Sequence, residues 1–379
     1  MNITTDSSVQ KYPVRVAHVV GKMVGGGLEA TVLNYYRNID RSKIQYDFLV
    51  DSDSTLIPRD EIEKLGGKII LIPPYQNQVA YQRELYKLFK EKNYKMVYSH
   101  MNTLSVFPMF AAWRANIPIR VAHNHSTAGG GEFKKNLMKY TLRLFGKIFP
   151  TNLCACSNFA GKWMYGNKSM KSGQVQVWQN ALDIDAFIYS KEKRATVRKK
   201  FNIEDKFVVG HVGRFIHQKN HHFIIEIFKE IHDKNSQSVL MLIGEGNLVP
   251  EIKAKVEQLD LKDSVIFTGN RNDVADLYQA MDVFILPSFY EGLGMVAVEA
   301  QIAALPTLCS DQVPEEARIC DDFYYLSLND SAKCWSEKIL EIGRNHIRLN
   351  MCEQAVYAGY DIKIAAKKMT DWYCSLLNI

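Results

Sequence analysis

The feature of this 379-residue chain that most restricts its fold is a repeated alternation of strand-like and helix-like segments. The strand-like run Val14–Val20 leads through a glycine turn into Leu28–Ile39, whose apolar residues recur at helical spacing. The alternation restarts at Phe207–Val212, and a second predicted helix follows at Asn220–Asp233. Parallel strands need crossover connections, which helices usually supply. We therefore expect an α/β fold made of two doubly wound, Rossmann-like halves.

Further segments continue the alternation in both halves. The predicted strands are Tyr46–Val50, Lys68–Ile72, Met96–Ser99, Arg120–Ala122, Asn152–Ala155, Val239–Ile243, Val265–Phe267, Val283–Leu286 and Thr307–Leu308. The predicted helices include Tyr81–Glu91, Lys134–Phe149, Pro250–Leu259, Val274–Met281 and Gly294–Ala303. The pattern lapses near Ala181–Lys193, so we predict an N-terminal domain at residues 1–180 and a C-terminal domain at residues 181–359. A last helix at about 360–379 can pack back on the N-terminal domain.

The composition excludes several other classes of protein. Hydrophobic residues make up 47% of the chain and charged residues 23%, which is typical of a globular protein rather than a disordered one. No apolar run approaches the ~20 residues of a membrane-spanning helix. Met1–Lys11 lacks the apolar core of a signal peptide. The seven cysteines are odd in number and scattered, which favours a reduced, cytoplasmic location over a disulfide framework.

The charge is divided unevenly between the two halves. Residues 1–180 contain 24 Lys and Arg against 12 Asp and Glu, whereas residues 181–379 contain 23 against 29. A basic half joined to an acidic half suggests two domains with different partners, although chance and solubility would also account for it. No aromatic and basic RNA-binding module accompanies the basic half, so we expect no nucleic-acid partner.

Two loops of the second half carry the residues best suited to bind an anion. Ligands of open α/β sheets bind beyond the carboxyl ends of the strands. Gly213, Arg214 and Lys219 follow the strand Phe207–Val212, and two cations on one loop suit a diphosphate. Solvated cations on a surface loop would have the same appearance.

The second of these loops follows Val283–Leu286 and enters a predicted helix. It reads Glu291, Gly292, Leu293, Gly294 and Met295. A carboxylate can accept hydrogen bonds from two vicinal hydroxyls, and the amides at a helix start can face a phosphate. An ordinary helix start without a ligand could have the same sequence. However, Glu299 follows three apolar residues in a predicted helix whose composition indicates burial. A buried carboxylate without a partner is costly, so we expect Glu299 to have a specific one.

The first half offers weaker signals. The turn Gly25–Gly27 can let a ligand approach the backbone, but it is neither a Walker A loop nor a G-x-G-x-x-G fingerprint, and a plain strand-to-helix turn is about as consistent. His123-Asn124-His125 follows a predicted strand, and histidine can bind a sugar hydroxyl or a metal. Because no cluster with metal-ligand spacing completes a site, we expect no metal.

The predicted helix Lys134–Phe149 is basic and amphipathic. Its cations recur at four-residue steps as Lys135, Lys139, Arg143 and Lys147, and these lie beside an apolar stripe. Such a helix can lie on an anionic membrane, and a solvated surface helix is the alternative. We expect peripheral contact with the cytoplasmic face of the cell membrane.

Together these motifs resemble those of the retaining glycosyltransferases of family 4, which have the GT-B fold. The resemblance covers roughly residues 14–375 and is closest to bacterial capsule and exopolysaccharide members. It is carried by Pro287-Ser288 with Glu291 and Glu299 (the family's E-x7-E signature), Gly213-Arg214 with Lys219, Gly244-Glu245-Gly246 and Phe267-Thr268-Gly269. Asn180 and Asp183 match a further stretch of the family pattern, in which Ala181 replaces the usual glycine.

The resemblance implies two Rossmann-like domains that face a central cleft and bind a nucleotide-sugar donor, with uridine the favoured base. Arg214 and Lys219 would neutralise the diphosphate, Glu299 would hold the ribose hydroxyls and Glu291 the hydroxyls of the donor sugar. His125 would lie by the reacting face of the sugar, with His123 as the fallback. The predicted catalytic residues are thus His125, Glu291, Arg214 and Lys219.

The resemblance completes the donor site with loop residues: Gly26, Gly27, Gly213, Gly244, Gly269, Arg271, Gly292, Leu293, Gly294, Met295 and Glu299. It implies transfer of a sugar to a growing, lipid-linked glycan in capsule or exopolysaccharide synthesis, without a metal cofactor. A nucleotide-sugar epimerase of GT-B type and a catalytically inactive GT-B subunit are the alternatives.

Overall fold

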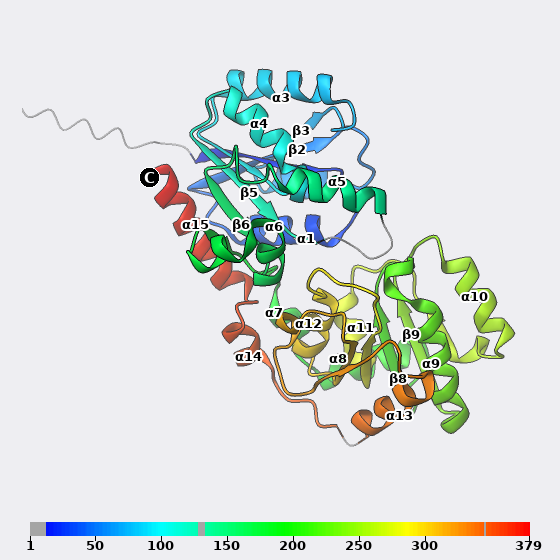
Figure 1. The fold of residues 1–379 in the computed structure, drawn as a ribbon. Coiled ribbons are helices and arrows are strands. Elements are labelled where there is room, and N and C mark those ends of the chain that lie inside the picture. Colours follow the sequence, from blue (N-terminus) through cyan, green and yellow to red (C-terminus); the bar gives the residue numbers. More distant parts are fainter. Residues whose placement is uncertain (1–12, 128–132, 345) are drawn as a thin grey trace, which may run out of the picture. The chain divides into compact units, whose positions relative to one another are not determined.

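The computed structural model describes residues 13–127, 133–344 and 346–379, which form two compact units (Figure 1). The first unit comprises residues 13–127, 134–182 and 362–379, and the second comprises residues 183–344 and 346–361. The chain passes from one to the other between Leu182 and Asp183, two residues after the predicted boundary. The C-terminal helix α15 (Ile362–Leu377) belongs to the first unit.

The first unit is built on a parallel sheet with the strand order β3-β2-β1-β4-β5-β6-β7. Its strands are β1 (Val14–Gly21), β2 (Ile44–Asp51), β3 (Lys68–Ile72), β4 (Met96–Ser99), β5 (Ile119–Asn124), β6 (Asn152–Ala155) and β7 (Val175–Val177). Its helices are α1 (Gly27–Asn38), α2 (Arg59–Lys64), α3 (Gln78–Lys92), α4 (Val106–Arg114), α5 (Phe133–Arg143), α6 (Asn158–Lys171) and α15, with a 3-10 turn η1 (Asn102–Ser105). The order reverses between β1 and β4, as in doubly wound folds.

Alternating side chains of the central strands supply the two cores of this unit. Val16 of β1 and Phe48 of β2 pack with Tyr36 of α1 and Tyr373 of α15. The intervening residues, among them Val19, point to the other face and pack with residues of α3 and α4. The central strands are therefore buried on both sides, which is typical of a parallel sheet.

The second unit is a smaller parallel sheet with the order β10-β9-β8-β11-β12-β13. Its strands are β8 (Phe207–Val212), β9 (Ser238–Ile243), β10 (Val265–Phe267), β11 (Val283–Leu286), β12 (Thr307–Ser310) and β13 (Phe323–Leu326). Its helices are α7 (Ile184–Phe187), α8 (Lys191–Phe201), α9 (His221–Lys234), α10 (Val249–Gln258), α11 (Val274–Ala280), α12 (Met295–Ile302), α13 (Ala332–Gly343) and α14 (Cys352–Tyr357), with 3-10 turns η2 (His217–Lys219), η3 (Lys262–Ser264) and η4 (Glu315–Ala317). Here the order reverses between β8 and β11, so the loops that follow these strands are neighbours.

The α/β fold and all of the predicted strands are confirmed, and each sheet has one further strand, β7 or β13, at its edge. One predicted helix is wrong in its extent. Helix α5 ends at Arg143 rather than at Phe149, because tighter turns follow it, with Gly146 N donating to Arg143 O. A Cβ at Gly146 would lie 2.5 Å from Cε of Met164, so the chain turns where α6 approaches it closely. Within the described residues, no helix combines the length and hydrophobicity needed to cross a bilayer.

Candidate active site

Two loops at the carboxyl edge of the second sheet bring a lysine and a carboxylate into contact. Lys219 ends the turn η2 after β8, and Glu291 lies in the loop after β11. The Nζ atom of Lys219 lies 2.7 Å from Oε1 of Glu291, and only 14% and 7% of these side chains are exposed. An ion pair with so little solvent around it is screened weakly, so the two charges stabilise each other in the free site.

A glutamine that was not predicted holds the second oxygen of this carboxylate. Nε2 of Gln218 donates to Oε2 of Glu291 over 3.3 Å and to the carbonyl oxygen of Tyr290 over 2.9 Å. The backbone ties the same loops together, because the N–H of Phe289 donates to the carbonyl oxygen of Gln218 over 2.9 Å. Both carboxylate oxygens of Glu291 therefore have a fixed partner.

Glu299, in the second turn of α12, has the specific partner that its position demands. The hydroxyl of Tyr278 on α11 donates to Oε2 of Glu299 over 3.0 Å and also lies 3.0 Å from the carbonyl oxygen of Val296. Burial raises the pKa of Glu299 to about 7, and the Tyr278 hydroxyl and the Lys219 ammonium limit this rise. Lys219 thus acts electrostatically on both carboxylates of the site.

Glycines close the loops beside this cluster. The N–H of Gly244 donates to the carbonyl oxygen of Gly269 over 3.0 Å, and a Cβ at Gly244 would lie 2.2 Å from the carbonyl oxygen of Gly213. Gly244 also has a φ of +133°, which L side chains rarely adopt. These glycines therefore hold together the loops after β8, β9 and β10.

The start of α12 offers amide groups at the same edge. Gly294 is its N-terminal cap, with a φ of +86°, and no side chain caps the helix. Amides at an uncapped helix start can bind an anion. The other predicted residues of this loop lie between Glu291 and the first turn of α12: Gly292, Leu293 and Met295.

The two predicted arginines of this unit differ. Arg214 is exposed, and its guanidinium makes no hydrogen bond or ion pair with a described residue, so it remains available to a ligand. Arg271 instead binds Asp273, with Nε 2.7 Å from Oδ1. That pair lowers the pKa of Asp273 and raises that of Arg271, so a ligand would have to compete with Asp273 for this side chain.

The predicted residues of the first unit lie at the carboxyl edge of its own sheet. Gly26 caps α1, and a Cβ there would lie 2.7 Å from Oε2 of Glu29, whereas a Cβ at Gly27 would meet no atom within 4 Å. His125 follows β5, and its backbone N–H donates to Oδ1 of Asn102 over 2.6 Å. Its ring stacks on that of His123, with 3.9 Å between the ring centroids.

The four predicted membrane-facing cations do not all lie on one helix. Lys147 lies beyond α5, and its Nζ lies 3.4 Å from the carbonyl oxygen of Tyr165 and 3.3 Å from Oγ of Ser169. Nζ of Lys139 donates to the carbonyl oxygen of Thr127 over 3.1 Å. The side chain of Lys135 lies outside the described residues. The prediction that one helix carries all four cations is therefore wrong, because the helix ends at Arg143.

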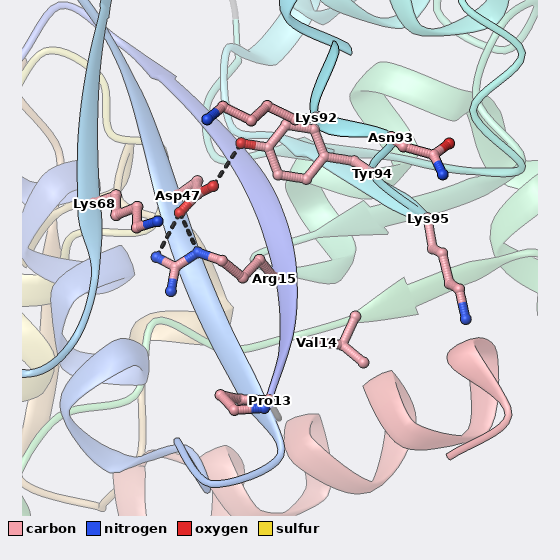
Figure 2. A pocket seen from close by; sticks show the side chains of 9 residues that line it. All are labelled: Pro13, Val14, Arg15, Asp47, Lys68, Lys92, Asn93, Tyr94 and Lys95. Carbon is pink, nitrogen blue, oxygen red and sulfur yellow. Dashed lines mark hydrogen bonds and ion pairs between the residues drawn. The ribbon is translucent and has the colours of Figure 1, made fainter. Parts of the chain in front are cut away.

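The first unit also has a pocket of about 250 Å³ near the amino ends of β1 and β4 (Figure 2). At its base, Nε of Arg15 lies 2.6 Å from Oδ1 of Asp47, and the Tyr94 hydroxyl donates to Oδ2 of the same carboxylate over 2.5 Å. The buried carboxylate thus already has a cation and a donor. Because open sheets bind ligands at the opposite edge, we assign this pocket a structural role.

Comparison with known proteins identifies the family. A family model described as "Glycosyl transferases group 1" matches residues 193–361, and one described as "Glycosyltransferase Family 4" matches residues 25–186. The putative glycosyltransferase EpsF of Bacillus subtilis (strain 168) is 32% identical over 332 residues, which cover 86% of each chain. The chain belongs to the family 4 glycosyltransferases. The predicted family and enzyme class are thus confirmed.

Other relatives of this glycosyltransferase agree with that assignment. The UDP-Gal:alpha-D-GlcNAc-diphosphoundecaprenol alpha-1,3-galactosyltransferase of Escherichia coli is 26% identical, over 77% of this chain and 78% of its own. The capsular polysaccharide biosynthesis glycosyltransferase CapH of Staphylococcus aureus is 22% identical, over 96% of this chain and 99% of its own. The solved structure of Anabaena Alr3699/HepE with UDP-glucose has a TM-score of 0.78 at 18% identity, over 95% of this chain and 99% of that one. This likeness confirms the predicted GT-B fold.

Proposed function

We propose that this enzyme transfers a sugar, with retention of configuration, from a UDP-sugar to a lipid-linked glycan in capsule or exopolysaccharide synthesis. The names of similar proteins support the donor, the acceptor and the kind of polysaccharide. CapH is named for capsular polysaccharide synthesis, and the E. coli relative is named for a UDP-galactose donor and a diphosphoundecaprenol acceptor. HepE, which shares the fold, was solved with UDP-glucose.

The observation that carries the proposal is the contact of Lys219 with Glu291 beside Glu299, at the carboxyl edge of the second sheet. Breaking a sugar–phosphate bond builds negative charge on the departing diphosphate. Preorganised cations and helix amides at that place stabilise the transition state without reorganisation. In this proposal Lys219, Arg214 and the start of α12 supply that stabilisation, and Glu299 accepts hydrogen bonds from the ribose.

The ion pair also gives Glu291 a role that depends on the donor. In the free site Lys219 neutralises Glu291. A diphosphate that attracts Lys219 would leave Oε1 of Glu291 free to accept hydrogen bonds from the donor sugar. Gln218 would keep the carboxylate in place during this exchange, because it binds the other oxygen. Sugar and diphosphate would then be recognised together rather than one by one.

We further propose that the diphosphate needs no divalent metal, since the side chains named above provide cations at the site. Calorimetry of the purified protein with UDP, GDP and ADP, each with EDTA present, tests the donor site. We expect UDP to bind clearly and the other two weakly. Binding of no nucleotide under these conditions, or binding that appears only after Mg²⁺ or Mn²⁺ is added, would contradict the proposal.

The surface around α5 supports peripheral membrane contact as part of this function. Three large apolar side chains there are strongly exposed: Leu137 by 60%, Leu144 by 78% and Ile148 by 60%. Arg143 adds a cation that lies 5.4 Å from the ring centroid of Trp163. Apolar side chains beside cations suit the boundary of an anionic bilayer. We place the reaction at the cytoplasmic face, where lipid-linked acceptors would be reached.

Liposome flotation tests this contact with a matched pair of variants. Leu144→Glu adds a charge within the α5 surface, and Val79→Glu adds one on α3, at a side chain that is 82% exposed. We expect Leu144→Glu to reduce flotation with anionic liposomes by several-fold and Val79→Glu to leave it unchanged. Equal flotation with neutral and anionic liposomes, or an equal effect of both variants, would contradict the membrane proposal and leave the donor-site proposal untouched.

A further inference from the structure

One stretch of the first unit combines many cations with no acidic residue. Residues 133–182 contain eight Lys and Arg and no Asp or Glu. They form α5, the turns after it, β6, α6 and β7. A surface that carries charge of one sign raises the local concentration of ions of the other sign. This part of the molecule is therefore suited to a negatively charged ligand.

A groove of about 600 Å³ lies within this stretch. It is formed by the second half of α5 and the turn after it on one side, and by the middle of α6 on the other. We call it the α5–α6 groove. Its volume is in the range of sites that bind small molecules.

The floor of the α5–α6 groove is fixed to the sheet. Met164 and Tyr165 of α6 are buried, and the Tyr165 hydroxyl donates to the carbonyl oxygen of Ala122 in β5 over 2.9 Å. The next residue, Gly166, kinks the helix with a φ of +85°, and a Cβ there would meet no atom within 4 Å. The groove is thus shaped before any ligand binds, and it is open at the kink.

Two cations line the α5–α6 groove, and neither pairs with an acidic residue within the described part of the chain. Nζ of Lys147 binds two neutral atoms of α6, the carbonyl oxygen of Tyr165 and Oγ of Ser169, so one of its three N–H groups remains. The guanidinium of Arg143 lies 5.4 Å from the ring centroid of Trp163. A guanidinium over a ring face keeps its N–H edge available for a phosphate.

The rim of the α5–α6 groove is apolar. Leu144 is 78% exposed and Tyr140 is 49% exposed, and both line the groove. Exposed apolar side chains beside unpaired cations favour a ligand that has an anionic head and a hydrocarbon chain. Two cations also suit a diphosphate better than a single phosphate, because each phosphate can then have its own partner.

We propose that the α5–α6 groove binds the diphosphate of the lipid-linked acceptor. Arg143 and Lys147 contact the phosphates, and the first isoprenoid units of the lipid lie along Leu144. That this lipid is the acceptor rests on the function proposed above, whereas the binding of a lipid diphosphate does not.

The place of the groove in the fold agrees with an acceptor site. Nζ of Lys139, in the second turn of α5, donates to the carbonyl oxygen of Thr127 in the loop after β5. Arg143 lies about 6 Å further along the helix, at 1.5 Å per residue. The lipid head is thus held about one helical turn from the carboxyl edge of the sheet, where open sheets bind ligands.

A flat contact with anionic phospholipids is the competing interpretation of these cations. It needs side chains that project outward into the headgroup layer. Lys147 is instead held against α6 by its two hydrogen bonds, and Arg143 is half-buried beside Trp163. The outward side chains here are apolar, so the membrane contact and the head-binding groove are separate parts of one surface.

Calorimetry with farnesyl diphosphate, in the presence of EDTA, tests the groove without the natural acceptor. We expect this probe to bind at least ~10-fold more tightly than inorganic pyrophosphate, since buried methylene groups add to the affinity. Vesicles of phosphatidylglycerol should displace it poorly. Equal binding of the two diphosphates, or displacement by the vesicles at equal accessible phosphate, would overturn the proposal.

Matched variants locate the bound probe. Arg143→Gln and Lys147→Gln should each weaken farnesyl diphosphate by at least ~5-fold, because each removes a charged partner of a phosphate. Lys171→Gln, at an exposed cation of α6, should leave the affinity unchanged. So should Lys219→Ala in the second unit. An equal loss with Lys171→Gln would show unspecific attraction, and a loss with Lys219→Ala would place the probe in the donor site; either result overturns the proposal.

One further variant separates the groove from the membrane contact. Thr141→Trp adds bulk to an exposed position of the groove wall and removes no charge. We expect it to weaken farnesyl diphosphate several-fold and to leave flotation with anionic liposomes unchanged. Unchanged binding of the probe would refute the groove as its site. These measurements use no UDP, so they stand apart from the test of the donor site.

Discussion

We predict that replacing the buried Glu299 by Gln will stabilise the protein and weaken its binding of nucleotide. Burial raises the pKa of Glu299 from 4.5 to about 7. The folded state therefore holds this proton more tightly than the unfolded state does. The associated stability is present below pH ~4.5 and is lost as the pH rises through about 7. Because one pKa unit corresponds to about 1.4 kcal/mol, the loss reaches at most about 3 kcal/mol above that pH.

Glu299→Gln removes the titrating group but keeps the shape of the side chain. At pH 8 the variant should exceed the wild type in free energy of unfolding by up to about 3 kcal/mol, and at pH 5 the difference should fall to about 1 kcal/mol or less. Nucleotide binding should change in the opposite sense. Loss of a charged acceptor for the ribose hydroxyls should weaken UDP by ~1.5–3 kcal/mol, or roughly 10- to 150-fold in Kd.

Thermal unfolding between pH 5 and pH 8, together with calorimetry of UDP at pH 8, measures both effects. Glu257→Gln, at an exposed carboxylate on α10, is the matched control, and we expect it to follow the wild type at every pH. The reasoning is refuted if Glu299→Gln and the wild type lose stability in parallel from pH 5 to pH 8. It is also refuted if the variant is the less stable protein at pH 8.

Three further substitutions test the rest of the site. Lys219→Ala should lower kcat by roughly 100-fold in steady-state kinetics, because the diphosphate charge grows in the transition state. Its affinity for UDP, measured by calorimetry, should fall by less than ~10-fold. An unchanged rate would remove Lys219 from the mechanism. Glu291→Gln should impair the use of the donor sugar while free UDP binds at least as tightly as before, because the charge that competes with the diphosphate for Lys219 is gone. An equal loss of both would assign Glu291 to the nucleotide instead. Gly244→Ala should cost at least ~2 kcal/mol in urea unfolding, since its Cβ would lie 2.2 Å from a carbonyl oxygen. Gly173→Ala, at a φ of +71° with no atom within 4 Å of its Cβ, is the control and should cost less.

The sequence predicted the elements of both sheets because their strands are short, apolar and regularly separated by helices. It missed β7 and β13, which contain only three and four residues at the edges of the sheets. It also extended α5 to Phe149, since the cations at four-residue steps continue beyond the place where the helix ends. Just beyond the end of the helix, Gly146 lies close to Met164 of α6, and such a tertiary contact leaves no periodic signal.

The charged site residues of the second unit could be predicted from the sequence, because they follow β8 and β11. The uncharged residues that orient their side chains could not. Gln218 lies one residue before Lys219 and has no distinctive neighbour in the sequence. Its role appears only when the two loops meet and its amide reaches Glu291. Tyr278 lies in the predicted helix Val274–Met281, and its ring is buried, yet its hydroxyl reaches Glu299. In both cases the contact joins segments whose separation along the chain hides it.

Three histidines of the first sheet show which signal a sequence pattern can miss. The sequence indicated only His123 and His125 there, which stand two residues apart. In the structure Nδ1 of His18 lies 3.0 Å from Nε2 of His100, and Nδ1 of His100 lies 3.1 Å from Nε2 of His125. His18 lies in the second half of β1, His100 directly follows β4 and His125 directly follows β5, and these strands are neighbours in the sheet. Polar residues toward the carboxyl ends of neighbouring parallel strands share one edge of the sheet, so the doubly wound strand order is the signal that brings these three histidines together.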